Sequence, residues 1–177
     1  MKTLLAILLF FLGTTCFAQS SPTVPAAAPG CGNVNTKFNV ETNEFQHPSA
    51  KPDHGKALVY FLQDDTSFTS RPRPTTRFGL DGNWLGATHA NSYFYVSVDP
   101  GEHHLCANWQ SFVIIGAGLT TAAAHFTAEP GGIYFFVAQN HGGEHQGAAG
   151  VALWPVDGDE AQILMSKFAL ATSRPKK

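Results

Sequence analysis

The residues with the clearest chemical potential form the run His141-Gly142-Gly143-Glu144-His145. Its letters match the H-x-x-E-H pattern of one class of zinc peptidase, in which two imidazoles hold the metal and a carboxylate accepts a proton from bound water. This chemistry needs both histidines one helical turn apart, and a Gly-Gly pair between two strand-like segments disfavours a helix. We therefore expect a solvated loop and no metal. His141, Glu144 and His145 remain the ligands of an alternative function, a metal-dependent hydrolase.

A second pair of candidate ligands, His103 and His104, is adjacent in the sequence. Neighbouring side chains of a strand point to opposite faces, so these two imidazoles cannot easily bind one ion together. We expect one to face solvent and the other to be half-buried and hydrogen-bonded.

Other catalytic signatures are missing from the sequence. It contains no G-x-S-x-G nucleophile elbow and no phosphate-binding glycine loop. The carboxylates at Asp64-Asp65 and at Asp157, Asp159 and Glu160 stand at the ends of predicted elements, where solvated turns and helix caps explain them. We predict a protein without catalytic residues or a cofactor.

The N-terminus has the pattern of a secretory signal peptide over residues 1–18. Lys2 precedes the apolar run Leu4 to Leu12, and small residues follow up to Ala18. The apolar run is too short for a membrane anchor. Lipidation of Cys16 is the alternative, but the position three residues earlier is Gly13 instead of the usual Leu.

Removal of the signal would leave two cysteines, Cys31 and Cys106. An even pair in an oxidising compartment indicates one disulfide, which we expect to pin the polar segment after Cys31 to the strand Glu102 to Trp109. The alternative is two unrelated thiols.

The composition indicates a globular chain with many turns. Of the 177 residues 44% are hydrophobic and only 14% charged, with 17 Gly and 11 Pro, which excludes a chain disordered over most of its length. The formal net charge of -2 gives no electrostatic reason to bind nucleic acid or an anionic membrane surface.

The pattern along the chain predicts an all-β protein, an antiparallel β-sandwich of seven or eight strands with a short C-terminal helix. A flexible Ser/Pro/Ala-rich spacer is expected over 19–30, a polar extension over 31–55, the sandwich over 56–172 and a basic tail over 173–177. The expected elements are a doubly buried strand at Lys56 to Gln63, a hairpin around Asp81-Gly82, strands at Tyr93 to Val98, Glu102 to Trp109, Ala124 to Ala128, Ile133 to Val137 and Ala149 to Pro155, and a helix capped by Asp157.

Two details of this pattern are specific enough to test. The turn Asp99-Pro100-Gly101 should join its flanking strands as a pair. The apolar, Gly- and Ala-rich run Phe112 to Ala124 should be a mobile connection.

Large aromatic residues form a possible ligand platform, with most of them expected in the core and one or two exposed: Trp84, Tyr93, Tyr95, Trp109 and Trp154.

The segments Lys56 to Gln63, Thr76 to Trp84 and Ser92 to Trp109, with Pro130-Gly131-Gly132-Ile133, resemble a bacterial exported family filed as domain of unknown function 2846. The turn Pro100-Gly101-Glu102-His103 after an aromatic strand also resembles the PEGA-type surface modules, which are small β-sandwiches. The resemblance implies export and a sandwich fold. It implies no catalytic residue.

Together these patterns predict an exported, non-catalytic binding or structural module of the cell envelope, periplasmic or secreted, with outer-membrane association as a further option. Its expected partner is an envelope protein or a glycan, with no nucleic acid and no transmembrane helix in the mature chain. A lipid-anchored structural protein is a second alternative to the binding module, beside the hydrolase.

We predict that the mature chain begins at Gln19, because small residues at Cys16 and Ala18 suit cleavage after Ala18. The intact mass of the exported protein measures this directly. A mass corresponding to a chain that starts at an acylated Cys16 would contradict the prediction and favour lipid anchoring.

Overall fold

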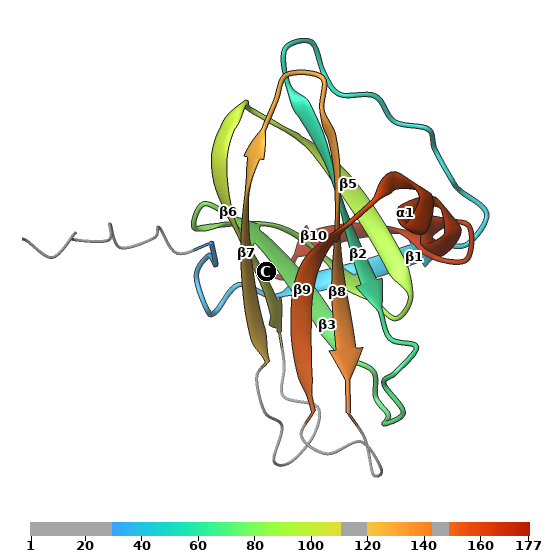
Figure 1. The fold of residues 1–177 in the computed structure, drawn as a ribbon. Helices are drawn as coiled ribbons and strands as arrows, with labels where there is room; N and C mark the ends of the chain where they lie inside the picture. Colours follow the sequence, from blue (N-terminus) through green and yellow to red (C-terminus); the bar gives the residue numbers. More distant parts are fainter. Residues whose placement is uncertain (1–29, 111–119, 143–148) are drawn as a thin grey trace, which may run out of the picture.

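The computed structural model describes residues 30–110, 120–142 and 149–177, which form two β-sheets packed face to face (Figure 1). The large sheet has the strand order β1-β10-β5-β2-β8-β9 and the small sheet the order β4-β3-β6-β7. The strands are β1 (Phe38–Asn43), β2 (Ala57–Asp64), β3 (Thr75–Leu80), β4 (Asn83–His89), β5 (Ser92–Val98), β6 (Gly101–Trp109), β7 (Thr121–Ala128), β8 (Ile133–His141), β9 (Gly150–Val156) and β10 (Ala169–Pro175). The all-β sandwich is confirmed, with one helix, α1 (Gly158–Met165).

Strand β2 lies inside the large sheet and is buried along its whole length, as predicted. Val59 and Phe61 face the small sheet, while Leu58 and Leu62 face the opposite way. Alternate residues of a strand point to opposite faces, so a strand that is apolar on both faces needs an apolar cover on each side. The small sheet covers one face, and α1 covers part of the other (Figure 1).

The core between the sheets is built mainly from aromatic rings. Phe61 contacts Phe78 of the small sheet at a centroid distance of 5.2 Å and stacks with Phe94 of its own sheet at 5.3 Å. Leu105 and Ala107 of β6 complete this layer. Offset and tilted aromatic pairs of this kind add about 0.5–1.5 kcal/mol each beyond the area they bury.

A polar network replaces the apolar core at one end of the sandwich. The Asn140 amide donates to Asp65 at 2.7 Å and accepts from the Trp109 indole at 2.7 Å. The Gln63 amide also donates to Asp65, at 2.9 and 3.0 Å, and accepts from the Thr88 hydroxyl at 2.7 Å. Burial raises the pKa of the Asp65 carboxyl, although these hydrogen bonds oppose the rise. The network satisfies polar groups that would otherwise be costly to bury.

The predicted hairpin at Asp81-Gly82 is confirmed and joins β3 to β4. Asp81 and Gly82 have φ angles of 49° and 81°. Positive φ at both central residues is the geometry of a type I′ turn, whose twist matches that of the paired strands.

The predicted pairing of the strands on either side of Asp99-Pro100-Gly101 is wrong. β5 pairs with β2 and β10 in the large sheet, whereas β6 pairs with β3 and β7 in the small sheet. The turn is therefore a corner that carries the chain from one sheet to the other. Gly101 takes a φ of 135° there. Both strands are apolar on their inner faces, and each strand buries that face in the core between the sheets instead of pairing with the other.

His103 holds this corner together. Its Nδ1 lies 2.6 Å from the Asp81 carboxylate and its Nε2 lies 2.7 Å from the Asp99 carbonyl oxygen. Both partners are acceptors, so the imidazole satisfies both only when it is protonated on both nitrogens. Burial opposes the charge, but these hydrogen bonds and the nearby carboxylates raise the pKa of His103 overall. The pKa of Asp81 is lowered, since its bonds from His103 and the His104 amide outweigh partial burial.

Three further details differ from the sequence-based expectation. The described residues form ten strands instead of seven or eight. β7 begins at Thr121, inside the run expected to be a mobile connection; residues 111–119 lie outside the described part of the chain. The sheets are not wholly antiparallel, because β2 pairs with β8 and β10 with β5 in parallel.

The chain ends of the sandwich are tied together. β1, from the polar segment after Cys31, pairs along its whole length with β10, which continues to Pro175.

The predicted cap of the helix is confirmed, because the Asp157 carboxylate accepts from the Glu160 amide at 2.8 Å.

We predict that the His103–Asp81 pair makes stability depend on pH. The pair contributes its whole stabilisation to the free energy of unfolding between the ordinary pKa values of Asp and His, at about pH 4 to 6.5. It is lost as pH rises through the raised pKa of His103, and as pH falls through the lowered pKa of Asp81. Denaturant unfolding of the wild type and of His103→Gln should therefore differ more at about pH 5.5 than at about pH 8.5. An equal difference at both values would show that folding leaves the pKa of His103 unshifted, and a smaller difference at pH 5.5 would show that it is lowered.

Candidate functional site

The outer face of the large sheet carries a hollow of about 510 Å³ between α1 and the connection from β1 to β2. This size is typical of small-ligand and peptide-side-chain pockets. The floor is aromatic: Tyr60 of β2, Tyr93 of β5 and Phe135 of β8 come from three adjacent strands. The ring of Tyr60 stacks on Phe135 at 5.0 Å. The alternation of each strand places these rings on the face opposite to the inter-sheet core.

The walls of the hollow come from the segments on either side of it. His47, Pro48, Ser49 and Ala50 form one wall, and Gln162, Met165 and Ser166 of the helical segment form the other. A second hollow of about 440 Å³ shares His47 and Pro48 with the first and adds Gln46, Tyr95 and Leu170. We refer to the two hollows together as the tyrosine groove.

Several apolar side chains around the tyrosine groove are exposed. Ile133, which lines the groove, is 48% exposed, and Phe45, just before the first wall, is 95% exposed. Ile163, the neighbour of Gln162 on α1, is also exposed but lines neither hollow and is not part of this surface. Exposed apolar side chains around a hollow are typical of a binding surface.

The tyrosine groove is uncharged. No Asp, Glu, Lys or Arg lines either hollow. Burial raises the pKa values of Tyr60 and Tyr93, so both hydroxyls stay protonated at neutral pH. Within the described residues, the hydroxyls of Tyr93 and Tyr95 have no hydrogen-bond partner. The groove therefore offers apolar surface and neutral hydrogen-bonding groups.

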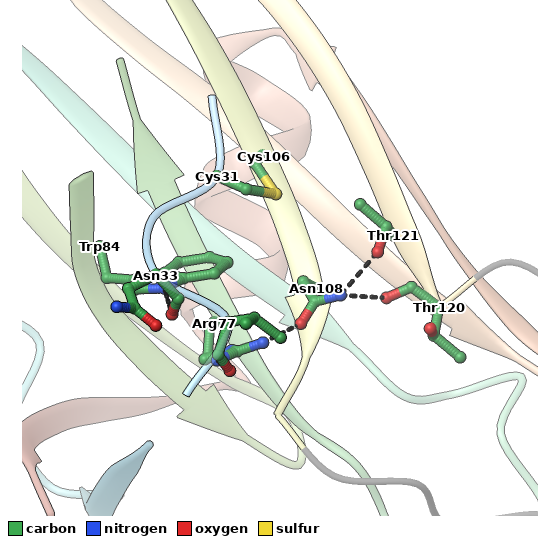
Figure 2. The surroundings of a disulfide bond; sticks show 9 residues. Cys31, Asn33, Arg77, Trp84, Cys106, Asn108, Thr120 and Thr121 are labelled. Atoms are coloured by element: carbon green, nitrogen blue, oxygen red, sulfur yellow. Dashed lines mark hydrogen bonds between the residues drawn. A yellow bond between two sulfur atoms is a disulfide. The ribbon is translucent and has the colours of Figure 1, made fainter. Parts of the chain in front are cut away.

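The opposite side of the sandwich is covered by residues 30–37, which we call the clasp (Figure 2). A disulfide joins Cys31 to Cys106 of β6 with a Cα–Cα distance of 5.0 Å, as predicted from the cysteine count. Cys106 points outward, because its neighbours Leu105 and Ala107 belong to the inter-sheet core. The clasp backbone lies so close to β3 that a Cβ at Gly79 would be 2.5 Å from the Gly30 carbonyl oxygen.

Arg77 attaches the clasp a second time. It is only 3% exposed, and its guanidinium donates to the carbonyl oxygens of Val34 and Thr36 and to the Asn108 side chain (Figure 2). The guanidinium carbon lies 4.3 Å from the ring centre of Trp84. The Trp84 indole in turn donates to the Asn33 carbonyl oxygen at 2.7 Å. Burial lowers the pKa of Arg77, but an arginine stays charged, and dipoles and an aromatic face balance that charge here.

The predicted candidate ligands do not form a metal centre in the described structure. His141 ends strand β8, paired with Gly150, while Glu144 and His145 lie outside the described residues. His103 is buried at the sheet-to-sheet corner and His104 lies on the outer face of β6, as the alternation predicted. Among the described residues, no group of three or more His, Cys, Asp or Glu is arranged to hold a metal ion.

The aromatic platform is divided among several environments. Trp109 is buried between the sheets and Tyr93 beneath the tyrosine groove. Trp84 is half-buried under the clasp, and Tyr95 and Trp154 are also half-buried. None of the five is fully exposed, so the expectation of one or two exposed rings is wrong.

Sequence reasoning missed most of the tyrosine groove. The alternation of β5 correctly put Tyr93 and Tyr95 on one face, but the walls come from an irregular segment and a short helix. Neither has a pattern that predicts where it packs. Arg77 was missed too, because an arginine in a hairpin strand is normally solvated.

The fold and its two outer faces define an all-β sandwich with an aromatic groove on one side and a disulfide-held clasp on the other. The chain belongs to the family described as Protein of unknown function (DUF2846), which matches residues 53–151. The match contains the floor of the tyrosine groove and Cys106, but neither wall and not Cys31. No curated protein and no solved structure matched the chain.

We predict that replacing Cys31 and Cys106 together by serine lowers the free energy of unfolding by about 4 kcal/mol, since the bridge closes a long loop. Hydrogen exchange should show that residues 30–37 lose protection, while β1 keeps it because β1 pairs with β10. Simultaneous loss of protection in β1 would mean that the disulfide, and not strand pairing, holds the whole N-terminal segment.

Proposed function

We propose that this protein is an exported, non-catalytic binding module that holds a partner polypeptide of the bacterial cell envelope in its tyrosine groove. The observation that carries the proposal is the groove itself, with its aromatic floor, uncharged lining and exposed apolar side chains such as Ile133. Protein interfaces are enriched in aromatic residues and Met and depleted in charged ones at their centre. The lining has that composition.

The chemistry of the groove supports binding instead of catalysis. Its titratable groups are His47 and tyrosines, and the buried Tyr60 and Tyr93 keep their protons at neutral pH. The Glu44 carbonyl oxygen lies 3.0 Å from the His47 Nε2 and orients the ring, but no carboxylate, lysine or cysteine lines the groove to act with it as a second catalytic group. An aromatic, neutral hollow supplies contact area and hydrogen bonds to a ligand that stays chemically unchanged.

Export is supported by the signal-peptide pattern of residues 1–18 and by the disulfide, since disulfides persist in oxidising compartments. Within the described residues, no helix is long and apolar enough to span a membrane. The partner we propose is therefore one that the mature chain meets outside the cytoplasm.

We predict that a photo-crosslinking amino acid at Gln162 captures a partner in intact cells, whereas the same probe at Ile163 does not. Gln162 lines the groove, and Ile163 is the adjacent exposed residue outside the lining. Adding Ile133→Lys to the Gln162 probe should reduce the adduct at least about tenfold, because it places a charge in the uncharged lining. The measurement is the mass and yield of adducts on gels, followed by fractionation of the cells.

The matched control is Ile163→Lys in the Gln162 probe background, which changes the same residue type outside the groove. We expect its adduct yield to equal that of the parent. Equal crosslinking from both probe positions, or no adduct at Gln162, would contradict binding in the groove. Recovery of the protein from the cytoplasmic fraction would contradict export.

A further inference from the structure

We propose that the occupant of the tyrosine groove is the proline-rich segment Gln19–Pro29 of a neighbouring copy of this chain. The inference rests on the proposed function, because it names the partner polypeptide that the groove binds. The segment reads Gln-Ser-Ser-Pro-Thr-Val-Pro-Ala-Ala-Ala-Pro, with prolines at 22, 25 and 29. In this arrangement the segment Gln19–Pro29 of one copy binds in the tyrosine groove of the next copy.

The chemistry of the segment matches that of the groove. Proline fixes φ near the value of the polyproline II helix, which has no internal hydrogen bonds and leaves its carbonyl oxygens free. Aromatic-lined grooves are the common binding sites for such segments. Here the Tyr95 hydroxyl and the Gln162 amide line the groove without a side-chain hydrogen bond to the described residues, so both are free to donate to those carbonyl oxygens.

Charge supports the same match. The segment contains no Asp, Glu, Lys or Arg, and neither does the lining of the groove. A charged peptide would lose hydration in this groove and find no opposite charge in return. The segment has four uncharged polar residues, Gln19, Ser20, Ser21 and Thr23, and its Pro, Ala and Val residues can bury apolar surface against Ile133 and Phe135.

The position of Gly30 indicates why the segment reaches a neighbour and not its own groove. Gly30 is held by the clasp on the outer face of the small sheet, whereas the groove lies on the outer face of the large sheet. To reach the groove of its own chain the segment would have to pass round an edge of both sheets, whereas the groove of a second copy can lie directly beside the clasp. Because the clasp fixes the start of the segment, a second copy is the nearer target.

The test measures self-association of the mature full-length chain by sedimentation velocity over a range of concentrations. One variant removes the segment's prolines (Pro22→Ser, Pro25→Ser and Pro29→Ser together), and another changes the groove (Ile133→Lys). We expect concentration-dependent association of the wild type and at least about tenfold weaker association of either variant. Ile163→Lys, outside the lining, should associate like the wild type.

Mixing the two variants provides a sharper test. The proline variant keeps an intact groove and the Ile133→Lys variant keeps an intact segment, so an equimolar mixture should form one-to-one complexes that neither forms alone. No self-association of the wild type up to about 1 mM, association unaffected by either variant, or no complex in the mixture would overturn the inference. If the wild type stays monomeric while the Gln162 probe still captures a different envelope protein, this inference fails and the proposed function stands.

Discussion

The two apolar faces of β2 are the constraint on which the rest of the structure depends. A strand buried on one face needs only one packing layer, but β2 is buried on both and therefore requires two. The small sheet supplies the first layer. The second layer is smaller, because a helix of eight residues and an irregular connection cover only part of a six-stranded sheet. The tyrosine groove is the part of the second face that these two segments leave open.

The sheet-to-sheet corners follow from the same constraint. A chain that paired β5 with β6 would take β6, and β7 that pairs with it, out of the small sheet and leave only β3 and β4 opposite β2. Instead the chain passes from the large sheet to the small sheet at Gly101 and returns to the large sheet through the β7–β8 connection, which contains Gly131. The hydrogen bonds of His103 to Asp81 and Asp99 connect the Gly101 corner to the β3–β4 turn. A buried imidazole held by two acceptors is thus a structural element, although its position beside His104 suggests a ligand.

Local patterns in the sequence were sufficient for most of the strands, the Asp81-Gly82 hairpin, the Asp157 cap and the disulfide. Each depends on residues close together in the chain, or, for the cysteines, on there being one pair left when Cys16 is assigned to the expected signal peptide. The pairing of the strands was harder to predict from the sequence. A turn such as Asp99-Pro100-Gly101 can join two paired strands, or it can carry the chain from one sheet to the other. The pairing of the edge strands β1 and β10 was hidden for another reason. They are polar on exposed positions such as Glu41 and Arg174, and their pairing is between the two ends of the chain.

The floor of the groove lies inside the residues that match the family, and its walls lie outside them. Its floor belongs to β2, β5 and β8, whose side chains on this face are required for the sheet to pack, whatever the groove binds. Its walls belong to residues 47–50 and to α1, which lie outside the matched range and are free to change without disturbing the inter-sheet core. The clasp is divided in the same way, since Cys106 and Arg77 lie on matched strands and Cys31 and Asn33 do not. A sandwich built in this manner keeps its aromatic floor as a packing requirement, and the segments before β2 and after β9 set the shape of the groove above it.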